Sequence, residues 1–197
     1  MNLYNEACVN SGLMPQFTEE YIAHFDGTDN AMYPSNDWAD FYFKPAILHN
    51  HYIKFNGGGD KVAYSVSAGY LDQDGIVDGT DYSKFSFRAN TNGKFFHDRL
   101  TVSTNISGYY GLQNDLIYGA ESTIGRIVKM TPMTYAKIEG VGWTDWFYDD
   151  AVLEAGGYKR NKVSNFNGNV KLNLKIIEGL YIDAAFNFDQ TIDLGTW

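Results

Sequence analysis

Between Gly57 and Val77 the chain reads "GGGDKVAYSVSAGYLDQDGIV", and from residue 61 to residue 71 its side chains alternate in character without a break. The apolar and aromatic side chains fall on one side of this run, at Val62, Tyr64, Val66, Ala68 and Tyr70. Because successive side chains of an extended strand point to opposite faces, the run predicts a β-strand with one apolar face. The fold class depends on what covers that face.

The same period of two recurs along the rest of the chain, in residues 49–56, 82–92, 99–111 and 165–189. Most of these runs last about ten residues or more, whereas strands of soluble proteins have a mode of about five or six. About nine to eleven residues is the length that a tilted strand needs to cross a bilayer. The opposite face is unusually hydrophilic in the last region, where it carries Asn165, Asn167, Asn169, Lys171 and Asn173. Such a row suits a water-filled lumen better than a packed core.

The connections alternate in length. Those at residues 57–60, 94–98 and 177–179 are short, and those at 72–81 and 112–160 are long. Outer-membrane barrels have short periplasmic turns and longer external loops. The sequence therefore predicts an all-β fold, an antiparallel up-and-down transmembrane β-barrel segment of about six strands with long external loops. The alternative is a soluble β-sandwich acting as a carbohydrate-binding module, which alternation alone does not exclude.

The two folds differ in the surroundings of the apolar face. In a barrel, six side chains should face lipid from the convex side of one curved sheet: Val62, Tyr64, Val66, Phe166, Leu172 and Phe186. In a sandwich they should pack against a second sheet.

Four regions follow from this pattern. Residues 1–48 form an irregular barrel loop segment, in which Thr18 is expected to cap one short helix. Residues 49–111 form two hairpins of barrel strands, residues 112–160 a long external loop, and residues 161–197 a further hairpin with the segment that follows it.

Composition excludes several classes of protein. The formal charge of −9 argues against nucleic acid as a partner, because phosphate contacts need clustered Lys and Arg. Cys8 is the single cysteine, so an intrachain disulfide is impossible. The opening "MNLYNEACVNSG" has no signal-peptide pattern, and no apolar run is long enough for a transmembrane helix.

Residues 33–92 resemble a known family. The shared features are "YPSNDW" at residues 33–38, "HNH" at 49–51, "GGGDKVAYSVSAGYLDQDGI" at 57–76 and "TDYSKFSFRAN" at 80–90. These features resemble the SusC/RagA-type TonB-linked outer-membrane proteins of Bacteroidetes-like bacteria.

The resemblance implies a barrel of roughly twenty-two strands with a plugged lumen in the cell outer membrane, in contact with its lipid. It implies import of an oligosaccharide or peptide, powered through TonB, with a SusD/RagB-like surface lipoprotein as a lid. The signal peptide, TonB box and plug are expected upstream of this chain. No cofactor is implied.

No catalytic constellation is present, so the chain is not expected to be an enzyme. The "DQDG" at Asp72–Gly75 resembles a calcium loop, but Ile76 would fall at a ligand position and has no side-chain oxygen. An Asp-rich external turn is the favoured interpretation. His49 and His51 share a strand face and could form half of a metal site, but no third ligand is evident, so no metal is expected.

The long loop supplies the candidate ligand-binding residues Trp143, Asp145, Trp146 and Tyr148. Aromatic rings cover the CH-rich faces of sugars, and carboxylates accept protons from sugar hydroxyls. Three alternatives remain open. The rings could pack the loop itself, contact the lipoprotein lid, or belong to an interfacial aromatic belt.

Overall fold

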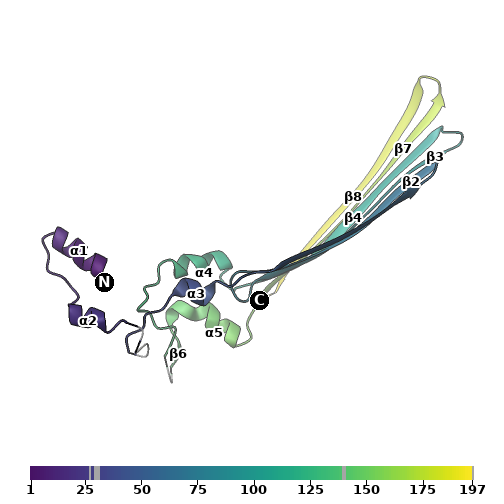
Figure 1. The fold of residues 1–197 in the computed structure, drawn as a ribbon. Helices are drawn as coiled ribbons and strands as arrows, with labels where there is room; N and C mark the ends of the chain where they lie inside the picture. Colours follow the sequence, from purple (N-terminus) through teal and green to yellow (C-terminus); the bar gives the residue numbers. More distant parts are fainter. Residues whose placement is uncertain (27, 29–31, 139–140, 197) are drawn as a thin grey trace. The chain divides into compact units, whose positions relative to one another are not determined.

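The computed structural model describes residues 1–26, 28, 32–138 and 141–196 (Figure 1). The chain divides into two compact units. One combines Met1–Phe43 with Glu121–Ala151, and the other combines Lys44–Ala120 with Val152–Trp197. We refer to them as the helical unit and the sheet unit.

The sheet unit is a single six-stranded antiparallel sheet in the order β1-β2-β3-β4-β7-β8 (Figure 1). Its strands are β1 (Leu48–Gly58), β2 (Val62–Asp74), β3 (Asp81–Phe95), β4 (Leu100–Asp115), β7 (Lys159–Ile177) and β8 (Leu180–Thr196). Strands that are neighbours in this sheet also follow one another along the chain, with β5 and β6 belonging to a separate sheet, as an up-and-down barrel requires. The sheet is open, with β1 and β8 at its edges.

The strand register places most of the apolar side chains of the six strands on one face. Residues directly opposite each other in neighbouring strands share a face. One such row runs across the sheet through Phe55, Val66, Ala89, Ile106, Gly168 and Phe188. A parallel row on the other face runs through Asn56, Ser65, Asn90, Asn105, Asn169 and Asn187. We call the two surfaces the apolar face and the polar face.

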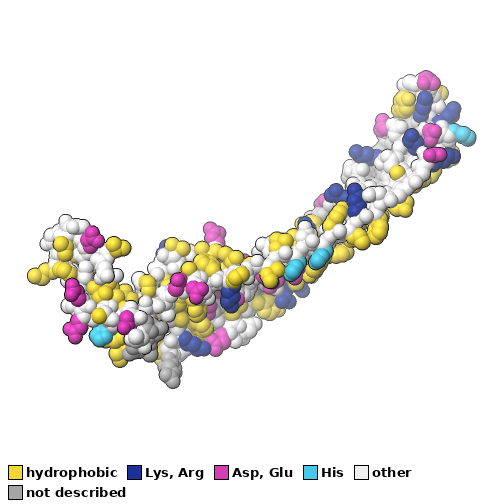
Figure 2. Space-filling view, viewed as in Figure 1, with side chains coloured by type: hydrophobic (Ala, Val, Ile, Leu, Met, Phe, Trp, Pro, Cys, Tyr) yellow, Lys and Arg dark blue, Asp and Glu magenta, His cyan; other side chains and the backbone are white. Residues whose placement is uncertain are grey.

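The apolar face is open over its whole area. Among the six side chains predicted to face lipid, exposed fractions range from 39% at Leu172 to 69% at Phe186, and Val62, Tyr64, Val66 and Phe166 lie between these values. Figure 2 shows hydrophobic side chains gathered along one margin of the sheet. Within the described residues the second sheet consists of two strands of two residues each, in the helical unit. The sandwich alternative is therefore wrong, and the barrel-segment fold is confirmed.

The apolar face has the length of a membrane crossing. It runs from Val62 to Tyr70 in β2, from Phe85 to Phe95 in β3, from Leu100 to Tyr110 in β4 and from Phe166 to Ile176 in β7. Each span covers the roughly nine to eleven residues that a tilted strand needs. None of these four spans places Asp, Glu, Lys or Arg on the apolar face. We call this surface the apolar band.

A row of polar side chains lies at the boundary of the apolar band at one end of the sheet. The Asn114 amide donates to both oxygens of Asp81, at 2.8 and 2.9 Å, and Arg160 Nε donates to Asn114 Oδ1 at 2.7 Å. These residues face each other across β3, β4 and β7. Charged and amide groups thus begin where the apolar band stops, as at the boundary between hydrocarbon and headgroups.

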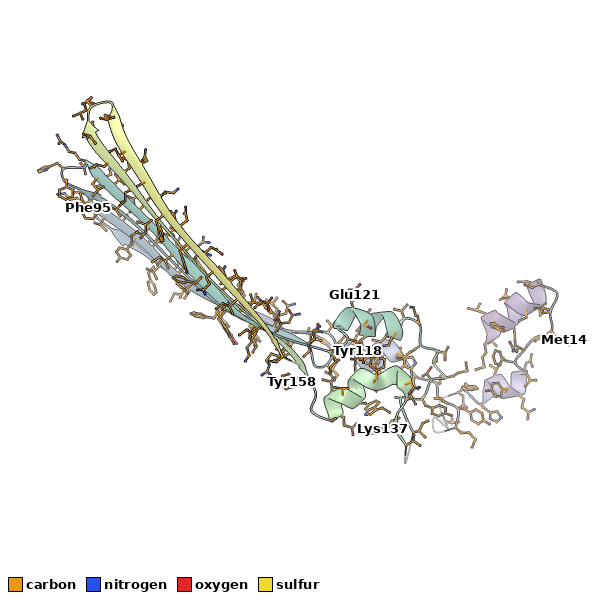
Figure 3. The ribbon with its side chains drawn as sticks, turned by 180° about the vertical axis from the view of Figure 1, so that it is seen from behind. Met14, Phe95, Tyr118, Glu121, Lys137 and Tyr158 are labelled. Carbon is orange, nitrogen blue, oxygen red and sulfur yellow. The ribbon has the colours of Figure 1, made fainter. Side chains whose placement is uncertain are left out.

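The connections show the predicted asymmetry. One end of the sheet carries the turns at residues 59–61, 96–99 and 178–179, and the opposite end carries residues 75–80 and 116–158. Figure 3 shows Phe95 at the first end and Tyr158 at the second. Gly179 has a φ of 84°, a left-handed conformation that glycine adopts without steric cost. The predicted turn at Asp72–Gly75 begins later, since β2 continues to Asp74.

Gly108 shapes the aromatic packing on the apolar face. It lies between Phe87 in β3 and Phe166 in β7 in the same row, and those two rings approach to 6.3 Å between centroids. A Cβ at Gly108 would lie 2.9 Å from the Phe87 ring and 2.8 Å from the carbonyl oxygen of Asn165. Because Gly108 has no side chain, the Phe87 and Phe166 rings can approach each other over β4, the strand that lies between them.

The helical unit contains structure that the sequence pattern did not predict. Its elements are α1 (Asn2–Asn10), α2 (Glu19–Ala23), α3 (Trp38–Tyr42), most of α4 (Ala120–Ile127), β5 (Lys137–Ile138), β6 (Gly142–Trp143), a 3₁₀ turn at Asp145–Phe147 and the first part of α5 (Tyr148–Glu154). The predicted helix after Thr18 is α2, and the Thr18 hydroxyl accepts from the Tyr21 amide at 3.1 Å. Among the described residues, every helix is too short or too polar to span a membrane.

Candidate functional site

An aromatic cluster around Phe147 forms the core of the helical unit. Phe147 is fully buried. Its ring lies 5.1 Å from Trp38, 6.1 Å from Tyr42 and 5.9 Å from Trp143, measured between centroids. These partners come from two segments far apart in the sequence, so burial of one ring holds α3 against the 3₁₀ turn.

The "YPSNDW" segment connects the same two parts of the chain through hydrogen bonds. The Trp38 indole N–H donates to the carbonyl of Thr131 at 2.8 Å, and the Asn36 amide donates to the carbonyl of Thr134 at 3.0 Å. Asp37 caps α3 by accepting from the amides of Ala39 and Asp40. The motif therefore has a structural role, because it orients α3 and satisfies backbone carbonyls of the opposing segment.

A buried ion pair stabilises α4 against α5 within the helical unit. The Arg126 guanidinium contacts the Asp149 carboxylate, and their side chains are 12% and 2% exposed. Asp149 also accepts from the Thr123 hydroxyl at 2.9 Å, and Arg126 lies 4.1 Å above the Tyr148 ring. A desolvated pair of this kind depends on both partners.

Asp150 makes a second carboxylate contact, in which the Tyr42 hydroxyl donates to Asp150 Oδ2 at 2.6 Å. Burial raises the pKa of the Asp150 carboxyl, although the bond from Tyr42 opposes that shift. Burial and the same hydrogen bond raise the pKa of Tyr42, which therefore remains a donor. The hydrogen bond from Tyr42 to Asp150 thus joins α3 to α5, and a protonated Asp150 carboxyl can still accept it.

The raised pKa of Asp150 predicts a pH dependence of local stability. The folded helical unit holds the proton more tightly than the unfolded chain does, so the free energy of unfolding falls as pH rises from about 4, the ordinary value of the carboxyl, through the raised pKa. We expect Asp150→Asn, which keeps an acceptor for Tyr42, to remove this decrease. Hydrogen-exchange protection of α5 in the whole protein, compared at pH 4.5 and 7.5 for the original and the variant, measures it. An equal pH response in both would contradict the assignment.

The side chains of three of the four predicted ligand residues are described by the structure, and their surroundings differ. Trp143 is half-buried, its ring packs against Phe147, and Lys137 Nζ lies 5.1 Å from its ring centroid. Tyr148 is half-buried beneath Arg126, and Asp145 is exposed at the start of the 3₁₀ turn. The side chain of Trp146 lies outside the described part of the structure. Trp143 and Tyr148 thus contribute to the packing of the loop, and ligand contact remains a prediction.

The candidate metal residues have no third partner in the described ranges. His49 and His51 share a face of β1, with parallel rings 6.3 Å apart. Residues 1–26, 28, 32–138 and 141–196 contain no group of three or more His, Cys, Asp or Glu side chains arranged to hold a metal ion.

The polar face carries a site that sequence reasoning missed. A hollow of about 380 Å³ lies over β2, β3, β4 and β7, and its lining includes Tyr52, Ser67, Lys84, Arg88, Tyr109 and Asn167. A second hollow of about 540 Å³ lies nearer the short turns, beside Asn90, Asn105 and Asn169. Alternation placed Lys84 and Arg88 on the polar face, but only the register shows which residues of β2 and β4 surround them. That the polar face is concave and the apolar face convex stays a prediction.

Taken together, an open antiparallel sheet with a charge-free apolar band and a hollowed polar face defines a segment of a transmembrane β-barrel. No model of a protein family matches the sequence. Among curated proteins, the chain is 35% identical over 71 residues to the TonB-dependent receptor SusC of Bacteroides thetaiotaomicron, an alignment covering 36% of this chain and 7% of that protein. It is 33% identical over 93 residues to the TonB-dependent receptor P26 of Formosa agariphila, covering 46% of this chain and 9% of that protein.

Solved structures agree on the fold. A structure of the RagAB peptide importer in the "closed-closed" state superposes with a TM-score of 0.63 at 19% identity, covering 93% of this chain and 24% of that chain. The sequence relatives are TonB-dependent receptors and the structural neighbours share the fold, so the chain resembles a barrel segment of the SusC/RagA type of TonB-dependent receptor. It spans between 7% and 17% of the length of the curated relatives that it matches.

Proposed function

We propose that the chain forms part of the wall of an outer-membrane nutrient importer that is powered through TonB. The observation that carries this proposal is the one-sided sheet, with an apolar band of membrane length on one face and a row of Asn and Ser on the other. Lipid covers the apolar band, and the polar face lines the water-filled interior. The role is transport, without catalysis by this segment.

Neighbouring residues of β2 test this assignment in the whole receptor. Ser65 and Val66 are adjacent in sequence and point to opposite faces. Spin labels are attached to Ser65→Cys and Val66→Cys in separate proteins, after removal of other cysteines. In lipid vesicles the label at 66 should collide with oxygen, which concentrates in lipid, and the label at 65 with a water-soluble nickel chelate. Equal accessibility of both labels to the nickel chelate would overturn the barrel-wall role.

The proposed partner is a SusD/RagB-like surface lipoprotein that meets the loop side of the receptor. The structural neighbour is named as the RagAB peptide importer, and a curated relative is SusC. The proposed ligand is an oligosaccharide or peptide. Trp143, Asp145, Trp146 and Tyr148 are the residues proposed to contact it.

Asp145 gives the sharpest test of that ligand contact, because its side chain is exposed and its loss leaves the Phe147 cluster intact. We expect Asp145→Ala to reduce ligand affinity about tenfold or more, since a hydrogen bond to a charged group contributes about 1.5–3 kcal/mol. Uptake of labelled oligosaccharide and peptide mixtures by cells carrying the whole receptor measures it. Asp40→Ala, which alters another exposed carboxylate of the helical unit, is the control. Unchanged uptake at normal surface expression would remove Asp145 from the ligand site.

A further inference from the structure

The hollow over β2, β3, β4 and β7 has an unusual charge pattern. Its lining contains two cationic side chains, Lys84 and Arg88, and no carboxylate. Both lie on β3, four residues apart on the polar face, which separates their Cα atoms by about 13 Å. Lys54 of β1 lies in the same row as Arg88, with Ser67 of β2 between them. The result is a cationic surface on one side of the polar face.

Neither cation is neutralised within the described part of the chain. The ion pairs there include those of Lys44, Arg126 and Lys175. Lys84 Nζ instead lies 4.7 Å from the centroid of the Tyr109 ring, which positions the ammonium group at the wall of the hollow. The carboxylates in the rows of Arg88 and Lys84 are Asp189 and Asp193 of β8, three strands away, or about 14 Å.

Neutral hydrogen-bonding groups surround the two cations. Ser67 is 8% exposed, and the Ser107 hydroxyl contacts Asn167, whose amide donates to Asn165 Oδ1 at 2.8 Å. The rings of Tyr52 and Tyr109 add flat apolar surface. The row from Asn56 to Asn187 contains no cation, so a row of this face can be hydrophilic without one. The positive charge of Lys84 and Arg88 is therefore not needed merely to keep the lumen face hydrated.

We propose that this hollow is a subsite for the carboxylate groups of an anionic oligomer moving along the polar face. The inference rests on the proposed import function and deepens it by assigning the charge of the ligand. Arg88 and Lys84 bind carboxylates separated by on the order of 13 Å, the spacing of their Cα atoms, and the Ser and Asn side chains bind the neutral groups between them. Acidic sugars and acidic peptides share this chemistry.

The test uses the whole receptor, purified in detergent, and the double variant Lys84→Gln/Arg88→Gln. The probes are trigalacturonate and triglutamate, with maltotriose and trialanine as their neutral counterparts. We expect the double variant to bind at least one acidic probe about tenfold to a hundredfold more weakly, with binding of the neutral probes unchanged. The acidic probe that is affected identifies sugar acids or acidic peptides as the ligand.

Lys171→Gln is the matched control, because Lys171 lies on the polar face beside the other hollow. It should leave binding of both acidic probes unchanged. The proposal is overturned if the whole receptor binds neither acidic probe, if the double variant binds both as the original does, or if Lys171→Gln causes an equal loss. Labels at residues 65 and 66 report the barrel wall separately, so a failure here is distinguishable from failure of the proposed function.

Discussion

Replacement of Ile106 by arginine is expected to destabilise the whole barrel by about 2–4 kcal/mol, the cost of a cation on the lipid face at mid-membrane. Ile106 lies near the middle of the Leu100–Tyr110 span of β4 and is 39% exposed in the sheet. Its row contains Ala89 and Gly168, neither of which can neutralise a charge. The guanidinium must therefore remain in hydrocarbon or deform the bilayer to reach water.

Asn105→Arg provides the control at the same depth. Asn105 is adjacent in sequence but belongs to the Asn row of the polar face, where an arginine is hydrated. We expect that variant to unfold within about 1 kcal/mol of the original receptor. The two variants are compared by urea unfolding of the whole receptor in lipid vesicles. The folded fraction is measured from the different gel mobilities of the folded and unfolded barrel in unheated samples. Equal destabilisation by both arginines would mean that the two faces do not differ in their surroundings.

Removal of the Asp149 carboxylate is expected to destabilise the helical unit by about 3–5 kcal/mol. Asp149→Ala leaves the Arg126 guanidinium without its buried counterion and the Thr123 hydroxyl without its acceptor. The Arg126 contact with the Tyr148 ring does not replace a carboxylate, since a cation–π contact contributes about 0.5–2 kcal/mol. Hydrogen exchange in α4 and α5 should therefore accelerate strongly while the sheet remains protected.

Two further variants separate charge loss from general damage. Asp145→Ala removes an exposed carboxylate a few residues away and should change protection of α4 and α5 little. The double variant Arg126→Met/Asp149→Leu removes both buried charges, and we expect it to recover much of the lost stability. If the double variant is no more stable than Asp149→Ala, the loss of stability does not come from leaving the Arg126 charge buried without a counterion.

The sheet could be predicted from the sequence because its side-chain pattern has one consistent solution. A shift of β2 by one residue against its neighbours would move the Val62, Val66 and Tyr70 side chains to the other face, so the pattern determines the register. The sequence analysis placed residues 112–115 of β4 and 159–160 of β7 in the long loop, because "LQND" and "KR" have no apolar alternation. Those ends are ordered by cross-strand polar contacts such as Asn114 with Asp81, which a single strand does not reveal.

The helical unit was less predictable because its main contacts join distant segments. Tyr42 and Asp150 are 108 residues apart, and Trp38 and Thr131 are 93 apart. Helix α3 is five residues long, too short for an amphipathic period, although Asp37 is a recognisable N-cap. The aromatic residues of the long loop were noticed, but composition cannot separate rings that pack together from rings that bind a ligand.

The outer ends of β4 and β7 also determine how far the barrel wall stands above the lipid. Beyond Tyr110, β4 continues to Asp115, which adds about 17 Å of strand, or about 12 Å of height at a 45° tilt. This exceeds the roughly 6–7 Å thickness of one headgroup layer. Tyr70, Phe85 and Tyr110 lie side by side below that rim and can anchor it at the interface. The connection after β4 therefore begins above the headgroup layer. The bilayer places little constraint on the sequence of that connection.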